Sequence, residues 1–287
     1  MNCKLVMNVD SGNCAKLDVE TLLKNLGYVA QVELIDSSSQ WNADGYDTVI
    51  VCGGDGTLHN AIDKCQDKKI FYAPCGTLNE LAATNASVTS VGKVNDQYFS
   101  YVCASGSFTE IGYSAKNKHK KRWKSLAYLP QIFRCYHCHE IGAKLDVDGK
   151  KFQGKYTLIM VLKSHRCFGF PFNKDYKKTG KTYLLAVRSF GADTLKNRVK
   201  MFAPFFRIFV CGVKPKICKN WMLLPFDQLT MELDSPQDFC LDGEKCVLGG
   251  VVHICRQTLA QPITVVDTPF LRCKRRNKNK NFETTKH

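Results

Sequence analysis

In the first hundred residues, short apolar runs typical of strands alternate with segments whose apolar residues have helical spacing. Residues 4–8 form a short apolar run typical of a buried strand, and residues 17–26 carry leucines at helical spacing before Gly27. The alternation continues with expected strands at 29–35, 48–52 and 70–73 and expected helices at 58–65 and from near Asn79. Strands separated by helices predict a parallel sheet, in which ligands bind at the carboxyl ends of the strands.

Beyond about residue 95 the pattern changes to strands with few helices. The expected strands are 98–104, 156–163, 181–189, 229–233 and 247–255, and one helical stretch at 193–205 interrupts them. This pattern predicts a second, mostly antiparallel domain that is joined to the first by short crossings, with a cleft between the two.

The length and composition of the chain are consistent with two domains. A length of 287 residues allows about two domains, or one domain with a large insertion, and 44% hydrophobic residues supply a core for each. No apolar run approaches the ~20 residues that span a bilayer, and the N-terminus lacks the order of a signal peptide. We therefore expect a soluble, cytoplasmic protein, and the composition excludes a small disulfide-stapled protein and a disordered acidic tail.

The fifteen cysteines are odd in number, which favours reduced thiols over a disulfide framework. Their one dense cluster lies at residues 135–139, which hold two cysteines, two histidines and a tyrosine. These residue types can bind zinc, but a structural zinc site needs four ligands and the chain offers no second pair to match. An ordinary strand or loop is the alternative interpretation.

Positive charge is in excess and uneven. The formal net charge is +15, and dense basic patches lie at residues 116–124 and 272–280. Nucleic acid, an anionic membrane surface or simple solubility each account for such patches, and a solvated loop and a frayed terminus are equally good interpretations of each patch alone.

The most specific motif directly follows the expected strand 48–52. Gly53-Gly54-Asp55-Gly56-Thr57 lets the backbone approach a polyanion, and the following helix offers free N–H groups to a phosphate. Asp55 could orient a hydrated Mg²⁺ or a substrate hydroxyl, and Thr57 could bind phosphate oxygens or cap the helix. The alternative is a plain turn between a strand and a capped helix.

Two further loops have a related construction. One runs from Pro74 through Gly76 and Thr77 to Asn79, and the other from Asn8 through Ser11 to Gly12. Because loops from neighbouring parallel strands emerge at one edge of a sheet, all three are expected to face one nucleotide.

In these motifs the chain resembles the catalytic-domain family of diacylglycerol kinases, sphingosine kinases and bacterial soluble lipid kinases. The resemblance rests on residues 53–57, on 74–79, on 8–12 with Val9 in place of proline, and on Asp242-Gly243-Glu244. It implies an α/β nucleotide-binding domain over residues 1–95, to which a segment at about 262–287 returns, and a β-sandwich-like lipid domain over 96–261. This is the two-domain architecture that lipid kinases share with NAD kinases, with ATP in the cleft.

The resemblance also implies roles for particular residues. The residues expected to bind ATP are Asn8, Ser11, Gly12, Gly53, Gly54, Asp55, Gly56, Thr57, Gly76, Thr77 and Asn79. Asp242-Gly243 alone is typical of a hairpin turn, but the order of the motifs makes Glu244 the expected base for a lipid hydroxyl. Asp242 and Asp55 would support it, and Mg²⁺ would neutralise the phosphates.

Two departures from the family pattern bear on the metal and on activity. The family commonly has Asn-Glu where this chain has His59-Asn60, which removes a carboxylate from the nucleotide helix. The acidic loop that binds a structural Mg²⁺ in the bacterial enzymes has its nearest counterpart at residues 175–181, which are rich in lysine. The sequence therefore leaves a metal site in the second domain undetermined.

The leading hypothesis is an ATP-dependent lipid kinase that phosphorylates a hydroxyl of diacylglycerol or a related lipid at an anionic membrane surface. The aromatic run at 202–209 is a candidate lipid passage, or alternatively a helix packed on the core. The other hypotheses are an NAD kinase, a non-catalytic nucleotide-binding regulatory protein, and a nucleic-acid-binding protein. The last rests on positive charge alone, because the chain has no nucleic-acid recognition motif. The resemblance allows a homodimer, which nothing in the composition requires.

Overall fold

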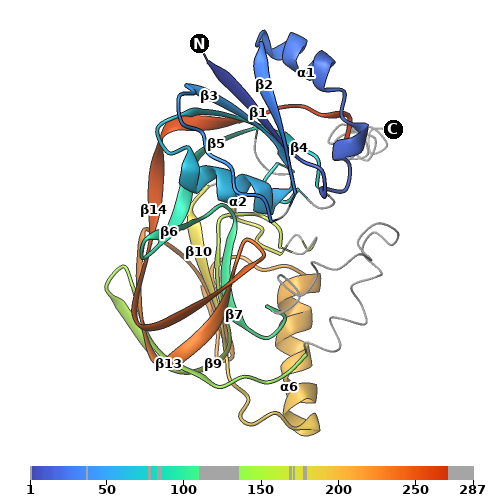
Figure 1. Ribbon diagram of the computed structural model, residues 1–287. Helices are drawn as coiled ribbons and strands as arrows, with labels where there is room; N and C mark the ends of the chain where they lie inside the picture. Colours follow the sequence, from blue (N-terminus) through green and yellow to red (C-terminus); the bar gives the residue numbers. More distant parts are fainter. Residues whose placement is uncertain are drawn as a thin grey trace, which may run out of the picture. The chain divides into compact units, whose positions relative to one another are not determined.

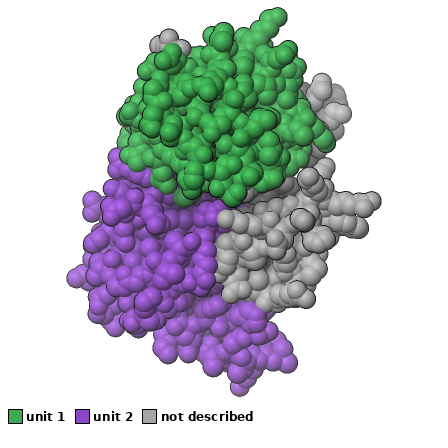
Figure 2. Space-filling model, in the orientation of Figure 1, with its two compact units in different colours: residues 1–90, 258–287 green, residues 91–257 purple. Residues whose placement is uncertain are grey.

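The structure is a computed structural model that describes residues 2–36, 38–76, 79–82, 86–109, 136–167, 170, 172–176 and 180–270 (Figure 1). The chain divides into two compact units (Figure 2). Unit 1 comprises residues 1–90 and 258–287, and unit 2 comprises residues 91–257. Unit 1 is therefore formed by two segments that lie far apart in the sequence.

Unit 1 is built on a parallel sheet. Its strand order is β14-β4-β3-β1-β2, and each neighbouring pair runs parallel. The strands are β1 (Cys3–Asn8), β2 (Ala30–Ile35), β3 (Thr48–Gly53), β4 (Lys69–Pro74) and the end of β14 (Glu244–Val265). β3 is buried along its whole length, as its unbroken β-branched run predicts.

The helices of unit 1 begin and end at recognisable capping residues. The short 3-10 helix η1 (Cys14–Lys16) precedes α1 (Val19–Leu26), where Asp18 caps the start by accepting from Thr21 N at 3.0 Å. α1 ends at Gly27, whose φ of 71° lies in the left-handed region. Leu22 of α1 packs with Leu5, Ile50 and Phe71 in the core of this unit.

Two expectations for helices in unit 1 differ from the structure. The helix α2 (Asp55–Lys64) begins earlier than the predicted 58–65, because Gly54 takes the N-cap position directly after β3. The helix expected from near Asn79 is wrong for the described residues 79–82, of which 80–82 form a turn. Asn79 has a φ of 47°, which a continuing right-handed helix does not allow.

Unit 2 is a mostly antiparallel β structure, as predicted. Its strand order is β11-β12-β10-β9-β7-β13-β14, with β8 pairing both β13 and β9 and with β6 pairing the end of β5. The strands are β5 (Ser87–Val94), which starts in unit 1, β6 (Gln97–Phe99), β7 (Val102–Gly106), β8 (Ile141–Val147), β9 (Lys150–Leu162), β10 (Thr182–Arg188), β11 (Lys216–Ile217), β12 (Trp221–Phe226), β13 (Gln228–Leu241) and β14.

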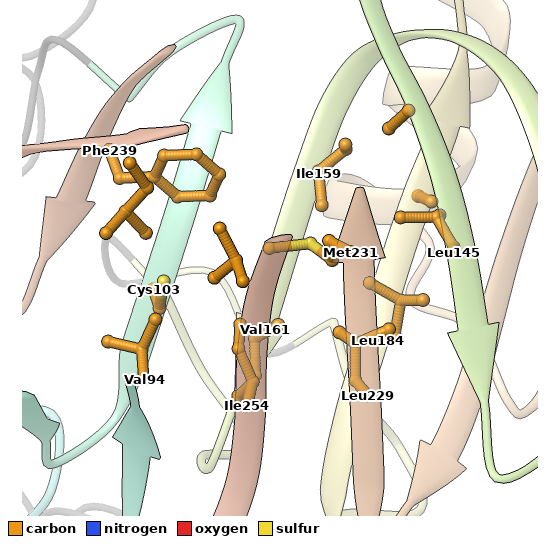
Figure 3. Close-up of a cluster of buried hydrophobic side chains, with 14 of the residues drawn as sticks. Val94, Cys103, Leu145, Ile159, Val161, Leu184, Leu229, Met231, Phe239 and Ile254 are labelled. Atoms are coloured by element: carbon orange, nitrogen blue, oxygen red, sulfur yellow. The ribbon is translucent and has the colours of Figure 1, made fainter. Parts of the chain in front are cut away.

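The long strands β9 and β13 close a ring of strands in unit 2. β9 pairs with β8 through its first half and with β7 through its second half, and β13 does the same. The ring β9-β7-β13-β8 encloses a large apolar core, whose side chains gather between the strands in Figure 3. Among the residues labelled there, Cys103, Ile159, Met231 and Phe239 are almost fully buried.

Unit 2 also carries α6 (Leu195–Phe205), which the sequence predicts at 193–205. Thr194 caps its start by accepting from Asn197 N at 3.3 Å. Pro204 lies inside the helix, and the π-helical turn η4 (Phe206–Val210) follows directly. A proline removes one backbone donor from the ladder, which is a known cause of such a local change in helix geometry.

Candidate functional site

Three loops that the sequence singles out meet at one edge of the unit 1 sheet. In the parallel register Met7 pairs with Cys52, and Gly53 pairs with Pro74. The loops that follow β1, β3 and β4 therefore leave neighbouring strands at the same level. This strand register brings the three loops together, as the sequence predicts.

The loop after β1 holds the other two loops through side-chain hydrogen bonds. Asn8 Nδ2 donates to Thr57 Oγ1 at 3.0 Å, and Ser11 Oγ accepts from Gly54 N at 3.2 Å. Asn13 Nδ2 donates to the carbonyl oxygen of Gly76 at 3.3 Å. Gly12 lies exposed in the turn between these residues. Asn13 was not singled out from the sequence, although a polar residue directly after Ser11-Gly12 was an available signal.

The backbones of the loops after β3 and β4 approach each other closely. The N–H groups of Cys75 and Gly76 both donate to the carbonyl oxygen of Gly53, at 2.7 and 3.2 Å. A Cβ added to Gly76 would lie 2.7 Å from Gly54 Cα and 2.6 Å from Asn79 Oδ1. Any side chain at Gly76 would therefore force these two loops apart.

Gly56 differs from its neighbours in the same motif. A Cβ on Gly53 would lie 2.5 Å from Thr57 Oγ1, whereas a Cβ on Gly56 would meet nothing within 4 Å. Packing thus explains the glycine at 53. It does not explain the glycine at 56, which stands beside open space in the first turn of α2.

The first turn of α2 presents backbone donors. Gly54, the N-cap residue, is extended and has no side chain that could cap the helix, in contrast to Asp18 at the start of α1. The first N–H groups of an α-helix have no partner within the helix, and they carry the positive end of its dipole. This geometry suits an anion such as a phosphate.

Asp55 is held in a fixed orientation within unit 1. Its Oδ2 accepts from Glu80 N at 2.8 Å, and its Oδ1 accepts from Tyr72 Oη at 3.4 Å. Burial and the adjacent Asp55 raise the pKa of Tyr72 well above its ordinary value, so the phenol stays a donor. Sequence reasoning missed Tyr72 and Glu80, because a tyrosine inside an apolar strand gives no signal of such a contact.

Asn79 offers an acceptor that no described residue uses. Its Nδ2 donates to the carbonyl oxygen of Gly76 at 2.8 Å, while its Oδ1 is buried and has no hydrogen-bond partner within the described part of the chain. Buried polar atoms are normally paired, so an unused oxygen beside Gly76 and Gly54 is a place for a ligand donor. Thr77, the remaining predicted residue of this loop, lies outside the described residues.

Asp242 and Glu244 lie in unit 2, at the turn between β13 and β14. Asp242 is buried and has a φ of 50°. Its carboxylate accepts the N–H groups of Tyr101 and Val102, each at 3.0 Å, and that of Ser100. This contact explains why the predicted strand 98–104 is divided into β6 and β7, since residues 100 and 101 donate to a side chain instead of a neighbouring strand.

Glu244 is half-buried and is the first residue of β14, where it pairs with Leu241. Asp242 is fixed by backbone donors and Glu244 follows it by two residues, so the two carboxylates belong to one hairpin. Lys245, its neighbour, forms an ion pair with Asp238 at 2.6 Å.

The described residues hold no group of three or more histidine, cysteine or carboxylate side chains that could bind a metal ion by themselves. His59 is buried in α2, and Asp175 accepts from Tyr183 Oη at 2.8 Å. Residues 177–179 of the lysine-rich loop lie outside the described part. A hydrated Mg²⁺ needs only one or two carboxylates when phosphates supply further ligands, and Asp55 is suited to that arrangement.

The cluster at 135–139 has structural roles where it is described. His137 Nδ1 lies 3.0 Å from Asp193 Oδ2, and Cys138 N donates to Asp193 Oδ1 at 2.9 Å. His139 N donates to Thr157 Oγ1 at 3.0 Å. Cys135 and the basic patches at 116–124 and 272–280 lie outside the described residues.

Part of the chain matches a known protein family. Residues 4–99 match the family described as the diacylglycerol kinase catalytic domain. Diacylglycerol kinases of Staphylococcus aureus strains JH9 and Newman are each 25% identical to the chain over 149 residues, which cover 44% of this chain and 47% of theirs. The matched region thus spans about half the length of these curated relatives.

Solved structures share the fold over nearly the whole chain. A diacylglycerol kinase from Bacillus anthracis str. Sterne superposes with a TM-score of 0.61 at 16% identity, covering 94% of this chain and 98% of the other. An NAD kinase from Archaeoglobus fulgidus in complex with ATP gives a TM-score of 0.50 at 13% identity, covering 97% and 98%. These likenesses confirm the predicted two-domain fold that lipid kinases share with NAD kinases.

Proposed function

We propose, from the match of residues 4–99 to the diacylglycerol kinase catalytic domain, that the protein is a lipid kinase. The proposed reaction transfers the γ-phosphoryl group of ATP to a hydroxyl of diacylglycerol or a related lipid. The observation that carries the proposal is the convergence of three loops around the start of α2, where a glycine takes the N-cap position.

The residues at this edge of the unit 1 sheet suit a nucleoside triphosphate. The N–H groups in the first turn of α2 would receive phosphate oxygens, and the open space at Gly56 leaves room for them. The close approach of Gly54 and Gly76 brings two backbone segments to one place, and Asn79 Oδ1 is an acceptor for a nucleotide donor. We assign Asn8, Ser11 and Thr57 to holding these loops in position, because their hydrogen bonds run between loops.

Asp55 is the residue that would hold Mg²⁺ together with the phosphates. The metal, when bound, would neutralise the negative charge that develops during phosphoryl transfer. The carboxylate of Asp55 is already oriented by Tyr72 and Glu80 N, so it has a defined direction in unit 1.

We propose Glu244 as the base that accepts the proton of the lipid hydroxyl. Support comes from its place after Asp242-Gly243 in the order of motifs and from its half-buried position at the start of β14. Asp242 is a positioning residue in this scheme, because its carboxylate is bonded to backbone N–H groups of residues 100–102.

The test is transfer of labelled phosphate from ATP and Mg²⁺ to lipids in mixed micelles. Diacylglycerol heads a panel of hydroxyl-bearing lipids, and NAD is the soluble control acceptor. We expect label in a lipid and none in NAD, with transfer lost in Glu244→Gln while ATP binding persists. Label in NAD alone, or transfer that is the same in Glu244→Gln, would contradict the proposal.

A further inference from the structure

One face of α6 and η4 is apolar and exposed. The exposed fractions are 80% for Leu195, 66% for Val199, 59% for Phe202, 47% for Phe206 and 61% for Val210. These positions are three or four residues apart, so they form one stripe along a helix, which we call the α6 stripe. Large apolar side chains that gather on a surface mark a site of interaction.

The α6 stripe is not what holds the helix to unit 2. The opposite face contributes Met201, Pro204, Phe205 and Ile208, all buried. The ring of Phe205 contacts that of Phe108 with centroids 5.1 Å apart. The aromatic run at 202–209, which the sequence offers as a candidate lipid passage or as a helix packed on the core, is thus divided between an inner anchoring face and an outer face.

Phe202 and Phe206 form the centre of the outer face. Their rings are stacked with centroids 5.8 Å apart, and both side chains are exposed. Phe205 and Phe209, on the inner side, stack on each other with ring centroids 5.7 Å apart. The helix therefore presents a preformed pair of aromatic rings to whatever contacts it.

The chain around the α6 stripe carries only positive charge. Residues 194–226 contain no aspartate or glutamate, and their basic residues are Lys196, Arg198, Lys200, Arg207, Lys214, Lys216 and Lys219. Lys196, Lys200 and Arg207, on the same helical segment as the stripe, are exposed. The nearest preceding carboxylate, Asp193, is paired with Arg198, whose Nε lies 2.8 Å from Asp193 Oδ1.

The start of α6 is fixed to the rest of unit 2. Asp193 joins Arg198 to the segment 136–138, because His137 and Cys138 N also contact its carboxylate. Arg198, beside it, lowers the pKa of Asp193, which therefore stays ionised. Tyr136 Oη adds a bond to the carbonyl oxygen of Arg198 at 2.8 Å. These contacts anchor the start of the helix that carries the stripe.

We infer that the α6 stripe and its flanking basic side chains are the surface by which unit 2 docks on an anionic lipid bilayer. An apolar helix face flanked by lysine and arginine is the pattern of an interfacial membrane helix. A second copy of the chain would bring like charges together around the stripe, which disfavours self-association through this face. The inference rests on the proposed lipid kinase function and adds that the lipid substrate is met in a bilayer. Its test measures membrane binding and does not require kinase activity.

The experiment is flotation of the full chain with vesicles, without ATP. Vesicles of phosphatidylcholine with phosphatidylglycerol are compared with vesicles of phosphatidylcholine alone. The variant Phe202→Ser/Phe206→Ser removes the outer ring pair, and Val247→Ser/Val251→Ser is the matched control, since Val247 and Val251 are 64% and 55% exposed on β14. Thermal unfolding of each variant shows whether the fold is intact.

We expect the Phe202→Ser/Phe206→Ser variant to bind anionic vesicles about tenfold more weakly than the wild type, because two partly inserted rings are lost. The Val247→Ser/Val251→Ser control should bind as the wild type does. The variant Lys196→Gln/Lys200→Gln/Arg207→Gln should bind anionic vesicles more weakly than the wild type, and its binding should depend less on salt concentration. Because residues 116–124 and 272–280 are also basic, the comparison of variants carries the test, not wild-type binding alone.

Equal binding by the wild type and the Phe202→Ser/Phe206→Ser variant would overturn the inference. A dimer in lipid-free sedimentation that this variant abolishes would also overturn it, since a second copy would then cover the stripe. The proposed function fails separately: it is lost if no lipid is labelled in detergent micelles, even when vesicle binding persists.

Discussion

Asn8 and Thr57, which lie in different loops, are joined by a 3.0 Å hydrogen bond from Asn8 Nδ2 to Thr57 Oγ1. This bond ties the end of β1 to the first turn of α2. Asn8 Oδ1 also accepts from Asp10 N at 3.0 Å, so one side chain orders its own loop and the next. The candidate nucleotide site depends on loops that hold one another, and this can be tested one bond at a time.

Replacing Asn8 by leucine should loosen that arrangement. Loss of two hydrogen bonds at a partly buried site is expected to cost about 1–3 kcal/mol of unfolding free energy. ATP binding should weaken about five- to tenfold, because the first turn of α2 loses its partner. Calorimetric titration with ATP and urea unfolding measure both effects. Asn60→Ala, on the exposed side of the same helix, should leave both unchanged, and an equal effect of the two substitutions would contradict the assignment.

Gly76 and Gly56 should respond to alanine in opposite ways. Gly76→Ala places a methyl group against Gly54 Cα, so we expect it to destabilise the protein by about 1–3 kcal/mol. Gly56→Ala has open space and lies in a helix, where alanine is favoured, so it should keep or raise the stability. The same methyl group would occupy the space assigned to phosphate and weaken ATP binding. If Gly56→Ala bound ATP as the wild type does, the phosphates would lie elsewhere.

Asp242 and Glu244 are two residues apart and should separate stability from activity. The Asp242 carboxylate accepts three backbone N–H groups, and an asparagine amide would turn its own donor towards one of them. Asp242→Asn should therefore lower the unfolding free energy by about 2–4 kcal/mol. Glu244→Gln should unfold at the wild-type urea concentration. Similar unfolding curves for the two variants would show that Asp242 does not have this structural role.

Lys163 should make the stability of the protein depend on alkaline pH. Its side chain is buried after β9, and burial, together with the nearby Arg256, lowers its pKa to about 8. In the unfolded chain the lysine titrates near about 10.4, so between these values the unfolded chain binds more protons than the native one. Stability from this group therefore rises as pH increases from about 8 to about 10, and below about 8 the native state carries the full cost of a buried ammonium.

The substitution Lys163→Met should accordingly raise the unfolding free energy near neutral pH by about 3 kcal/mol and remove this rise. Urea unfolding across the alkaline range measures it. Lys150→Met, at the exposed start of β9, is the control and should keep the wild-type pH profile. A Lys163→Met protein with that same profile would show that the ammonium is solvated in the native state.

The loops of the candidate site were predictable because their signals are local. A glycine run directly after a β-branched strand identifies both the strand end and the helix start, and the parallel order brings such loops together. Tyr72 and Glu80 were missed because their contacts with Asp55 depend on how β4 and its loop pack, which no local pattern records. The helix expected near Asn79 was wrong because that residue is left-handed.

Long-range contacts set the remaining limit. The division of the strand predicted at 98–104 depends on Asp242, more than a hundred residues away in the chain. β8 and β12 were not predicted from the sequence. In the structure, buried and less buried positions alternate along β8. The aromatic run at 202–209 was identified from composition, but its two faces follow from helical periodicity combined with the packing of Phe205 and Phe209.

The most direct test of the central claim combines ATP binding with phosphate transfer in the same samples. The full chain and its Glu244→Gln variant are given labelled ATP, Mg²⁺ and diacylglycerol in mixed micelles. The account predicts that both proteins bind ATP with similar affinity and that only the wild type labels a lipid. ATP binding by the wild type without label in any lipid of the panel would contradict the claim that this protein is a lipid kinase.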